Sequence, residues 1–481
     1  MPQRPNILFI MSDDHAAHAI SSYGSIINQT PHIDRLARGG LRLTDCFCTN
    51  SICTPSRASI LTGQYGHVSG VRTLADKLDN SRQVQVQKLL QNAGYRTGIF
   101  GKWHLGHGPQ PDGTNADPAG FDDWCVLPGQ GLYFDPDFHT PRGKVKYSGY
   151  VSDIISDLSL DWLNHWHLGQ RAGGSEPFFL CVHHKAPHRE WEPGPAYQHL
   201  YEDEDIPAPV TFDDTYEGRP AAAMAMMRVD RDLHKKDVKE NPPWGLTAEA
   251  LRHWKYQRYI KDYLRCVASV DASVGRLLDW LDENGLAEDT IVIYTSDQGF
   301  FLGDHGWYDK RFIYEESLRM PFLMRYPREL AAGGVCEEML TNSDFAPTLL
   351  DYAGVAAPGE MQGVSARAML HGETPPDWQQ SLYYRYWMHL LDHNVVAHYG
   401  VRTRTHKLIY FYGRGLGVAG ASDVETPAYW ELYDLTRDPI EMHNVYDDPA
   451  YAGVQRELHA ELNRLQSFYG DMPEHDAVAH A

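Results

Sequence analysis

The sequence predicts an α/β protein in which helices sandwich a large, mostly parallel sheet, followed by a smaller C-terminal α+β domain built on an antiparallel sheet. Short apolar runs alternate with helical stretches over most of the chain, which is typical of a parallel sheet. After residue 371 the runs become aromatic-rich and alternate apolar with polar residues, which indicates antiparallel strands. We therefore expect a large domain over 1–371 and a C-terminal subdomain over 372–481 that ends in a helix.

The large domain is expected to contain four buried strands. Each is a short apolar run, such as NILFIMS, and such runs are typical of strands covered on both faces. The four runs are 6–12, 97–101, 178–184 and 290–296. A helix is predicted to begin at Thr30-Pro31, because proline suits a first helical turn. Another is predicted over about 247–284, with Gly285 as the residue that ends it.

The remaining segments are interpreted from their composition. The C-terminal strands are expected in the runs SLYYRYWM, YGVRTRTHKLIYFY and WELYDL. The stretch 200–245 is rich in Asp, Glu, Lys and Arg, so we expect a surface insertion there.

Composition excludes several classes of partner. The 481 residues carry a formal net charge of −21, which repels polyanions, so neither nucleic acid nor an anionic membrane is expected to bind. Seven cysteines, an odd number in a long chain, argue against a disulfide framework. No run of about 18 apolar residues occurs, so no membrane span is expected. Association into a homo-oligomer stays open.

The start of the chain bears on location. Its apolar run is followed at once by acidic residues and by no small-residue cleavage site, so we interpret it as a strand and not as a signal peptide. A cytoplasmic location is expected, and a trimmed leader would instead indicate the periplasm or the exterior.

Acidic and amide side chains follow two of the predicted strands. Asp13 and Asp14 close the first strand, and Asp297 and Gln298 close the last. If the two strands are neighbours in a parallel sheet, these side chains meet at one sheet edge, where ligands bind in such folds. Oxygen ligands without thiolate or imidazole suit a hard cation, Ca²⁺ before Mg²⁺.

Three further loops at strand ends carry basic residues. A histidine there could act as a general acid or base near neutral pH, and a lysine could hold an anionic oxygen. The residues are Lys102 and His104 in GKWHLG, His184, Lys185 and His188 in HKAPHREW, and His305 and Lys310 in DHGWYDKR. A basic pocket around a dication suits a tetrahedral oxyanion ester.

Two other hydrolytic sites are weaker interpretations. The chain has no H-E-x-x-H, and Cys46 and Cys48 lack a second pair at zinc-ligand spacing. It also has no G-x-S-x-G turn for a serine nucleophile.

The segment CTPSRASILTG, residues 53–63, matches the sulfatase signature C-x-P-S-R-x-x-x-L-T-G at every fixed position. The chain therefore resembles the formylglycine-dependent type I sulfatases of the alkaline phosphatase superfamily. The acid-ended strands, the signature, GKWHLG, the P-H loop and the downstream lysine occur in the family's order over nearly the whole chain. HKAPHREW and the long stretch around SDQGFFLGDHGWYDKR look most like bacterial sulfatases for N-acetylglucosamine-6-sulfate.

The resemblance implies a modified residue at the centre of the site. A formylglycine-generating enzyme would oxidise Cys53, reading Pro55 and Arg57 in the extended chain. One hydroxyl of the hydrated aldehyde would attack sulfur, and loss of a proton from the other would expel sulfate. By position, the catalytic residues implied are Cys53, Arg57, Lys102, His104, His188 and Lys310. The implied Ca²⁺ ligands are Asp13, Asp14, Cys53, Asp297 and Gln298, the last of which is Asn in many members.

Sugar recognition is expected from the stretch 386–404, which is rich in His, Asp, Arg and aromatic residues. The predicted substrate-binding residues are His184, Asp392, His393, His398 and Arg402. The alternative is that this stretch packs the two domains together. His188 is the expected acid for the leaving alcohol, with His184 as a competitor.

The activity implied is exo-acting removal of 6-O-sulfate from a terminal N-acetylglucosamine or a related sulfated glycan. One alternative is a phosphodiesterase or phosphonate monoester hydrolase on the same scaffold. The other is a glycan-binding protein without catalysis, against which the intact signature argues.

Overall fold

The computed structural model describes residues 4–108, 110 and 115–471. Its centre is a ten-stranded sheet in the order β13-β2-β12-β9-β1-β8-β4-β5-β6-β7. The strands are β1 (Asn6–Ser12), β2 (Leu41–Leu43), β4 (Arg96–Lys102), β5 (Asp123–Leu127), β6 (Asp137–Thr140), β7 (Gly143–Lys146), β8 (Phe178–His183), β9 (Thr290–Ser296), β12 (Phe322–Arg325) and β13 (Gly334–Cys336).

The four predicted strands form the middle of this sheet. β9, β1, β8 and β4 are parallel neighbours, and β5 continues the parallel order. Antiparallel strands flank them, with β12 beside β9 and β6 beside β5. The sheet is thus mostly parallel at its centre, and the carboxyl ends of its central strands lie at one edge.

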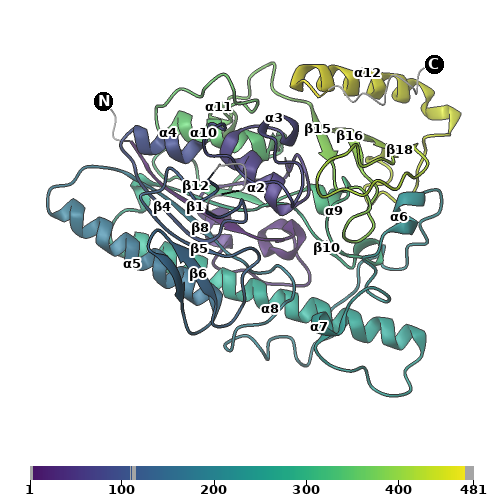
Figure 1. The fold of residues 1–481 in the computed structure, drawn as a ribbon, viewed down its shortest axis with the longest axis horizontal. Coiled ribbons are helices and arrows are strands. Elements are labelled where there is room, and N and C mark those ends of the chain that lie inside the picture. The colour runs from purple at the N-terminus through teal and green to yellow at the C-terminus, as the bar shows by residue number, and fades with distance from the viewer. Residues whose placement is uncertain (1–3, 109, 111–114, 472–481) are drawn as a thin grey trace.

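Helices cover both faces of the sheet (Figure 1). The long helices α5 (Val151–Arg171) and α8 (Ala248–Glu283) pack against each other on one face. On the other face lie α2 (Cys53–Thr62), α4 (Val86–Asn92) and α10 (Phe345–Tyr352), in mutual contact. The remaining short helices are α1 (Asp34–Gly39), α3 (Gly66–Ser69), α6 (Pro220–Met224), α7 (Lys235–Val238), α9 (Glu315–Leu318) and α11 (Arg367–Leu370).

The predicted helix boundaries are confirmed in one case and shifted in the other. α8 begins after Thr247, whose hydroxyl accepts from the N–H of Ala250, and Gly285 follows it with φ +68°. The helix predicted from Thr30-Pro31 begins only at Asp34. The carboxylate of Asp271 on α8 accepts the N–H of Ile33 at 2.8 Å and so holds the preceding segment as a turn.

The C-terminal part is an antiparallel sheet backed by one helix. Strands β15 (Ser381–Tyr386), β16 (His398–Thr403), β17 (His406–Phe411) and β18 (Tyr429–Asp434) pair in sequence order. Tyr384 and Tyr386 pack into the main core, whereas Tyr383 packs with α12 (Ala452–Tyr469) on the other face. This alternation is the period-two pattern of a strand between two layers.

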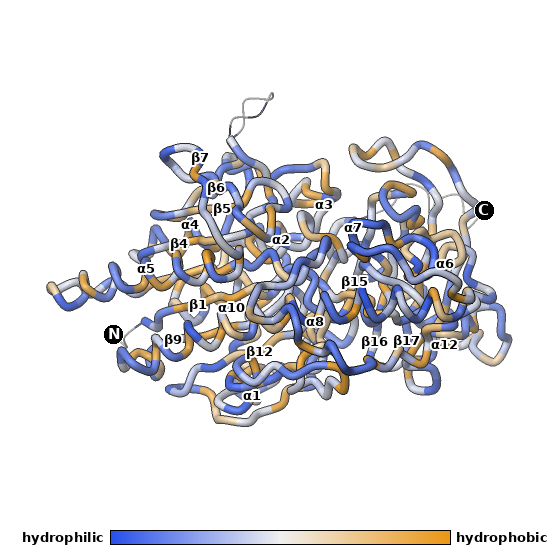
Figure 2. Tube along the Cα trace, turned by 90° about the horizontal axis from the view of Figure 1, so that it is seen from below, coloured by the Kyte–Doolittle hydropathy of each residue, from blue (hydrophilic) through white to orange (hydrophobic). Residues whose placement is uncertain are grey.

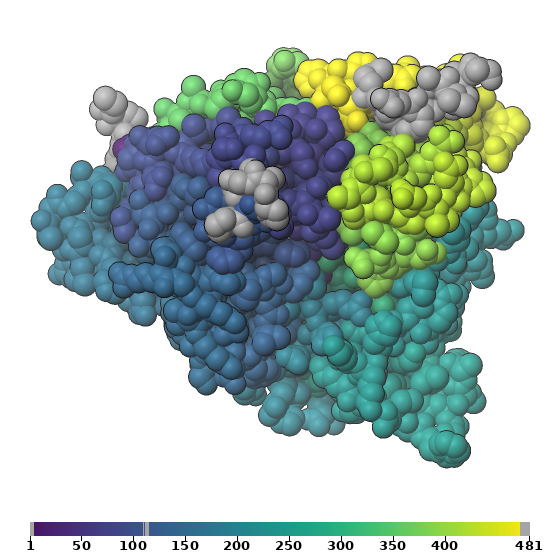
Figure 3. Space-filling model, viewed as in Figure 1, coloured from purple at the N-terminus to yellow at the C-terminus, as the bar shows by residue number. Residues whose placement is uncertain are grey.

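This C-terminal part lies at one end of the molecule, beside the large sheet (Figure 2). In the space-filling view its yellow-green surface directly adjoins the dark blue-violet surface of an early part of the large domain (Figure 3). Four two-residue strands complete the fold. They pair as β10 (Phe301–Leu302) with β11 (Tyr308–Asp309), and β14 (Leu340–Thr341) with β3 (Cys46–Phe47).

The stretch 200–245 is more than the surface insertion expected from its charge. It contains α6 and α7, and it buries Asp214, Arg219 and Asp237 against the rest of the chain. Arg219 pairs with Asp214, which in turn accepts from His305 at 2.7 Å. Most of the charged side chains in this stretch, such as Glu204, are exposed, as expected of a surface insertion. The three buried ones are held in ion pairs.

No helix in the described ranges combines the length and apolar character that a membrane span needs. All seven cysteines are free thiols.

Candidate active site

The sheet register brings the two acid-ended strands together. In the parallel pair β1–β9, Ser12 lies opposite Ser296, so Asp13 and Asp14 emerge beside Asp297. All three carboxylates are fully buried, and one oxygen of each lies within 4.8 Å of the others. The N–H of Asp14 also donates to Asp297 Oδ1 at 3.1 Å. The predicted meeting of these side chains at one sheet edge is confirmed.

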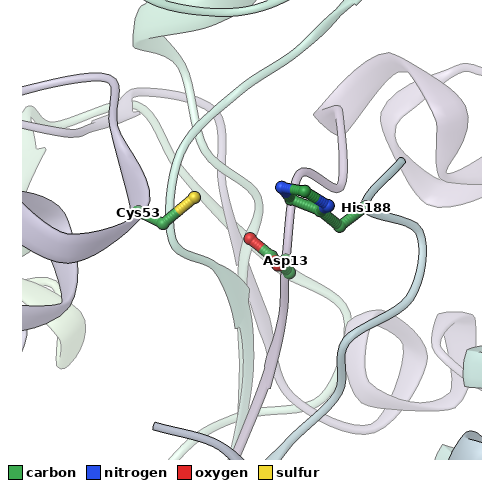
Figure 4. Close-up of side chains that lie close together, drawn as sticks. All are labelled: Asp13, Cys53 and His188. Carbon is green, nitrogen blue, oxygen red and sulfur yellow. The ribbon is translucent and has the colours of Figure 1, made fainter. Parts of the chain in front are cut away.

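Helix α2 places Cys53 at the same edge. Cys53 is its first residue, after Ile52 in an extended conformation, so the thiol sits at the N-terminus of the helix. The side chains of Cys53, Asp13 and His188 point toward one another (Figure 4), with ligand atoms within 4.8 Å. The hydroxyl of Ser56 donates to the carbonyl of Asp297 and ties the helix to the end of β9.

Three cations from different segments oppose the carboxylates. Lys102, the last residue of β4, donates to Asp13. Lys310 reaches both carboxylate oxygens of Asp14, at 2.5 and 2.7 Å. Arg57, one turn along α2 from Cys53, pairs with Asp297. All three cations are almost completely buried.

The carboxylates titrate differently because of their surroundings. Burial raises the pKa of Asp14 to about 7 and that of Asp297 to about 6, and neighbouring carboxylates add to both increases. Burial would also raise the pKa of Asp13, yet the cations around it, Lys102 first, hold it well below its usual range. The protein cations alone therefore leave two of the three carboxylates poorly stabilised as anions.

The oxygen atoms of this cluster fit a hard cation. Asp13 Oδ1 and Gln298 Oε1 are buried and have no hydrogen-bond partner among the described residues. The amide nitrogen of Gln298 donates to Asp14, so the amide group lies against the cluster. Carboxylate and amide oxygens are ligands of Ca²⁺ and Mg²⁺, and a dication would offset the charge that raises the pKa of Asp14.

Cys53 itself is a poor nucleophile as a thiol. Burial, with Asp13 beside it, raises its pKa to about 12. Since the thiolate is the reactive form, the unmodified residue would be almost inert at neutral pH.

Two histidines flank the cluster. Nδ1 of His188 donates to the carbonyl of Arg189, and Nε2 lies 3.8 Å from Asp14 Oδ2. His104 follows Lys102 and has its Nδ1 3.5 Å from the hydroxyl of Thr54. Burial holds the pKa of both histidines well below the usual range, so both rings are neutral and can accept a proton.

A pocket of about 630 Å³ has Cys53 in its lining. His188 and Lys310 line it near the cluster, while Ile52 and Leu74 supply apolar wall. Most of the rest of its wall comes from four segments far apart in sequence. These contribute Arg189, then Met226, Arg231, Asp232 and His234, and then Asp309, Arg311, Asp392 and His393.

Of the four C-terminal residues predicted to bind substrate, two line the pocket and two do not. Asp392 and His393 line the pocket, and His393 Nε2 lies 3.1 Å from Asp309 Oδ2. His398 is fully buried, where Nε2 accepts from the N–H of Ile313 and Nδ1 donates to a backbone carbonyl. His398 therefore packs the domains together, as the alternative interpretation held.

Arg402 and His184 also lie outside the pocket lining. Arg402 is buried and binds both carboxylate oxygens of Glu315, each at 3.2 Å. His184 is fully buried, and burial lowers its pKa to about 3. Neither residue is in place to bind a sugar, and His184 does not compete with His188 for the acid role.

Several pocket residues were not foreseen from the sequence. Asp309 and Arg311 flank Lys310, so their position beside a predicted residue was the available signal. Arg189 follows His188 directly and binds Asp237 with two hydrogen bonds, at 3.2 and 2.7 Å. Asp237 lies in the charged stretch 200–245, where nothing in the sequence marked a contact with the site.

Comparison with known proteins agrees with this geometry. A family profile described as "Sulfatase" matches residues 5–355, and one described as "N-sulphoglucosamine sulphohydrolase, C-terminal" matches residues 303–468. The N-acetylglucosamine-6-O-sulfatase of Bacteroides thetaiotaomicron is 38% identical, over 98% of this chain and 87% of the relative. The ulvan-active sulfatase of Formosa agariphila is 26% identical, over 98% of this chain and 82% of the relative.

Solved structures give the same fold. A protein in complex with its substrate D-glucosamine-2-N,6-O-disulfate is 39% identical, with a TM-score of 0.89 over 98% of this chain and 99% of that one. The phosphonate monoester hydrolase of Agrobacterium radiobacter shares the alkaline phosphatase-like fold, at 22% identity and a TM-score of 0.76 over 97% and 96% of the two chains. With a matching profile over most of its length and a relative 38% identical along nearly all of it, the chain belongs to the sulfatase family and is a hydrolase of sulfate esters.

Proposed function

We propose that this sulfatase removes the 6-O-sulfate of a terminal N-acetylglucosamine, or of a closely related sulfated glucosamine, with formylglycine at position 53 and Ca²⁺ at the carboxylate cluster. The observation that carries the proposal is a pocket whose lining combines Cys53 with hydrogen-bonding side chains such as Asp309, Asp392 and His393. The relative at 38% identity is an N-acetylglucosamine-6-O-sulfatase, and the solved structure at 39% identity holds D-glucosamine-2-N,6-O-disulfate as its substrate.

Each residue of the site would have its own role in the reaction. Formylglycine and Ca²⁺, when present, supply a hydrated aldehyde as nucleophile and a positive charge for the sulfate oxygens. Lys102 and Lys310 both lie near enough to Cys53 to stabilise a negative charge there, and would hold two sulfate oxygens. His104, neutral in the protein, would accept the proton that is lost when sulfate is expelled.

His188 is the proposed acid for the leaving alcohol. Because its Nδ1–H is bound by the Arg189 carbonyl, Nε2 is the nitrogen that faces the cluster and substrate. Nε2 carries a proton only in the imidazolium, and an anionic sulfate ester beside the ring favours that form. An alkoxide from a sugar is a poor leaving group and needs this proton, whereas a nitrophenolate hardly does.

The wall of the pocket suits a sugar rather than a flat aryl group. Sugar hydroxyls both donate and accept hydrogen bonds, and the wall pairs carboxylates with cations or imidazole. Asp309 is bound by Arg311 and by His393, and Asp392 lies 3.8 Å from Arg311. These residues would read the hydroxyls of the terminal sugar.

A panel of esters tests the proposal. Enzyme with converted position 53 is assayed for sulfate release from N-acetylglucosamine-6-sulfate, N-acetylglucosamine-3-sulfate, galactose-6-sulfate and an aryl sulfate, and for hydrolysis of an aryl phosphodiester. We expect the highest kcat/KM on a 6-sulfated glucosamine. Preference for the galactose ester or for the 3-sulfate contradicts the sugar assignment, and preference for the phosphodiester contradicts sulfatase as the main activity.

A further inference from the structure

Lys185 is a buried cation to which the proposed mechanism gives no task. It follows β8, three residues before His188, and only 3% of its surface is exposed. Within the described part of the chain, no carboxylate lies at ion-pair distance from its ammonium group. A methionine would fill the same space without the cost of burying a charge, so the charge itself calls for an explanation.

Asp13 and Asp14 attract the charge of Lys185 from beyond ion-pair distance, whereas its direct contacts in the described part of the chain lead to the turn that carries His188. Its Nζ lies 3.4 Å from the carbonyl oxygen of Arg189, the oxygen that also accepts from His188 Nδ1. The same Nζ stands 4.6 Å from the ring centroid of Tyr133. The hydroxyl of Tyr133 in turn donates to the carbonyl of His188 at 2.6 Å.

The Arg189 carbonyl therefore serves two donors, and its position sets the orientation of the imidazole. If the carbonyl swings away, Nδ1 loses its acceptor and the ring is free to rotate about its side-chain bonds. Nε2 would then leave the direction of the cluster. Burial lowers the pKa of Lys185 to about 8, which leaves it mostly charged at neutral pH and a strong donor.

We propose that Lys185 is a positioning residue for His188: it holds the Arg189 carbonyl that fixes the imidazole with Nε2 toward the leaving oxygen. The inference rests on the proposed role of His188 as the acid. Lys185 does not line the pocket, so it acts through His188 and not by touching substrate.

The test compares the effect of Lys185→Met on the hydrolysis of two substrates with different leaving groups. We expect kcat on N-acetylglucosamine-6-sulfate to fall at least ~10-fold, and kcat on 4-nitrophenyl sulfate to fall less than ~3-fold, with little change in KM for either. Parallel losses on the two substrates would overturn the proposal, because a purely structural role would not distinguish leaving groups.

A double-mutant cycle separates this proposal from the proposed function. His188→Ala should also lower kcat much more on the sugar sulfate than on the aryl sulfate. Adding Lys185→Met to His188→Ala should lower kcat on the sugar sulfate by less than a further ~2-fold, because both changes remove the same function. If the double variant instead loses kcat on the sugar sulfate by the product of the two single losses, the positioning role is overturned. If His188→Ala shows no split, both the acid role and the positioning role fail, while sulfatase activity on the sugar would still stand.

Tyr133→Phe supplies a second variant in case Lys185→Met does not fold. It removes only the hydroxyl that holds the His188 carbonyl, and it should give a smaller loss with the same dependence on leaving group. Tyr150→Phe is the matched control, since that ring stacks on Tyr133 but its hydroxyl donates to the backbone carbonyl of Glu192. Equal behaviour of the two tyrosine variants on both substrates would contradict the proposal.

Discussion

The guanidinium of Arg57 donates from Nε to the carboxylate of Asp297 at 2.9 Å, and its Nη1 donates to the carbonyl of Lys102 at 2.8 Å. One side chain thus joins the helix that starts at Cys53 to the ends of β9 and β4. The signature segment, the carboxylate cluster and Lys102 are held in one geometry by this arginine.

Replacement of Arg57 by methionine should therefore abolish turnover and destabilise the fold. Loss of one partner from a buried ion pair typically costs about 3–5 kcal/mol of the free energy of unfolding, because the other charge stays buried. Arg276→Met is the matched control, since its pair with Asp157 is exposed and should contribute less than about 1 kcal/mol. Denaturant unfolding of both variants measures the difference, and similar stabilities would contradict the account.

The carboxylate cluster should bind Ca²⁺ in a way that stabilises the fold. At a Ca²⁺ concentration 100-fold above Kd, a ligand bound only by the native state adds about 2.7 kcal/mol. Gln298→Leu removes the unpartnered amide oxygen without a change in charge, so its thermal shift with Ca²⁺ should be smaller. Gln198→Leu, on an exposed loop, should shift like the wild type. A full shift in Gln298→Leu, or none in the wild type, would refute the site.

The bond between Arg189 and Asp237 should anchor the inserted segment to the pocket. Asp237 also accepts the N–H of His234 at 2.8 Å, so Asp237→Asn loosens this part of the wall. We expect KM for the sugar sulfate to rise about tenfold, a loss of about 1.4 kcal/mol, with aryl-sulfate turnover unchanged. Asp230→Asn, which breaks a surface pair with Arg228, is the control. Equal losses on the two substrates would show that Asp237 serves stability alone.

Substitution of His393 and substitution of His398 should have different effects on activity and stability. His393→Ala removes a pocket residue and should lower sugar-sulfate turnover at least ~10-fold with aryl sulfate spared. His398→Ala leaves the buried N–H of Ile313 without an acceptor, which costs about 1–3 kcal/mol, and should lower the Tm and both activities together. If His398→Ala lost activity only on the sugar sulfate, His398 would have to be a substrate-binding residue after all.

The chemistry at the sheet edge could be predicted because strand ends fix where side chains meet. Asp13 and Asp297 each follow a buried apolar run, and parallel pairing then brings them together whatever the rest of the chain does. The roles of Cys53 and His188 were predicted from the resemblance, which rests on a specific signature and on the order of the motifs along the chain. Placement of both at the cluster agrees with that order.

The pocket wall could not be predicted, since it depends on contacts between distant segments. Arg189 and Asp237 are 48 residues apart, and Asp309 and His393 are 84 apart. His398 was misplaced because β16 is buried on both faces, so its sequence does not alternate and polar residues enter the core. Most charged residues of 200–245 are exposed, as the composition predicted, whereas Asp214, Arg219 and Asp237 form ion pairs in the interior.

The central claim is that sulfate release depends on formylglycine at position 53. The most direct measurement compares preparations of the protein made with and without a formylglycine-generating enzyme. Mass spectrometry of the peptide containing residue 53 gives the fraction in which H₂S has been exchanged for oxygen, and the same samples are assayed on N-acetylglucosamine-6-sulfate. The account predicts a rate proportional to the converted fraction, reaching zero with unconverted protein and with Cys53→Ala. Sulfate release by either of these unconverted proteins at a rate near that of converted enzyme would contradict it.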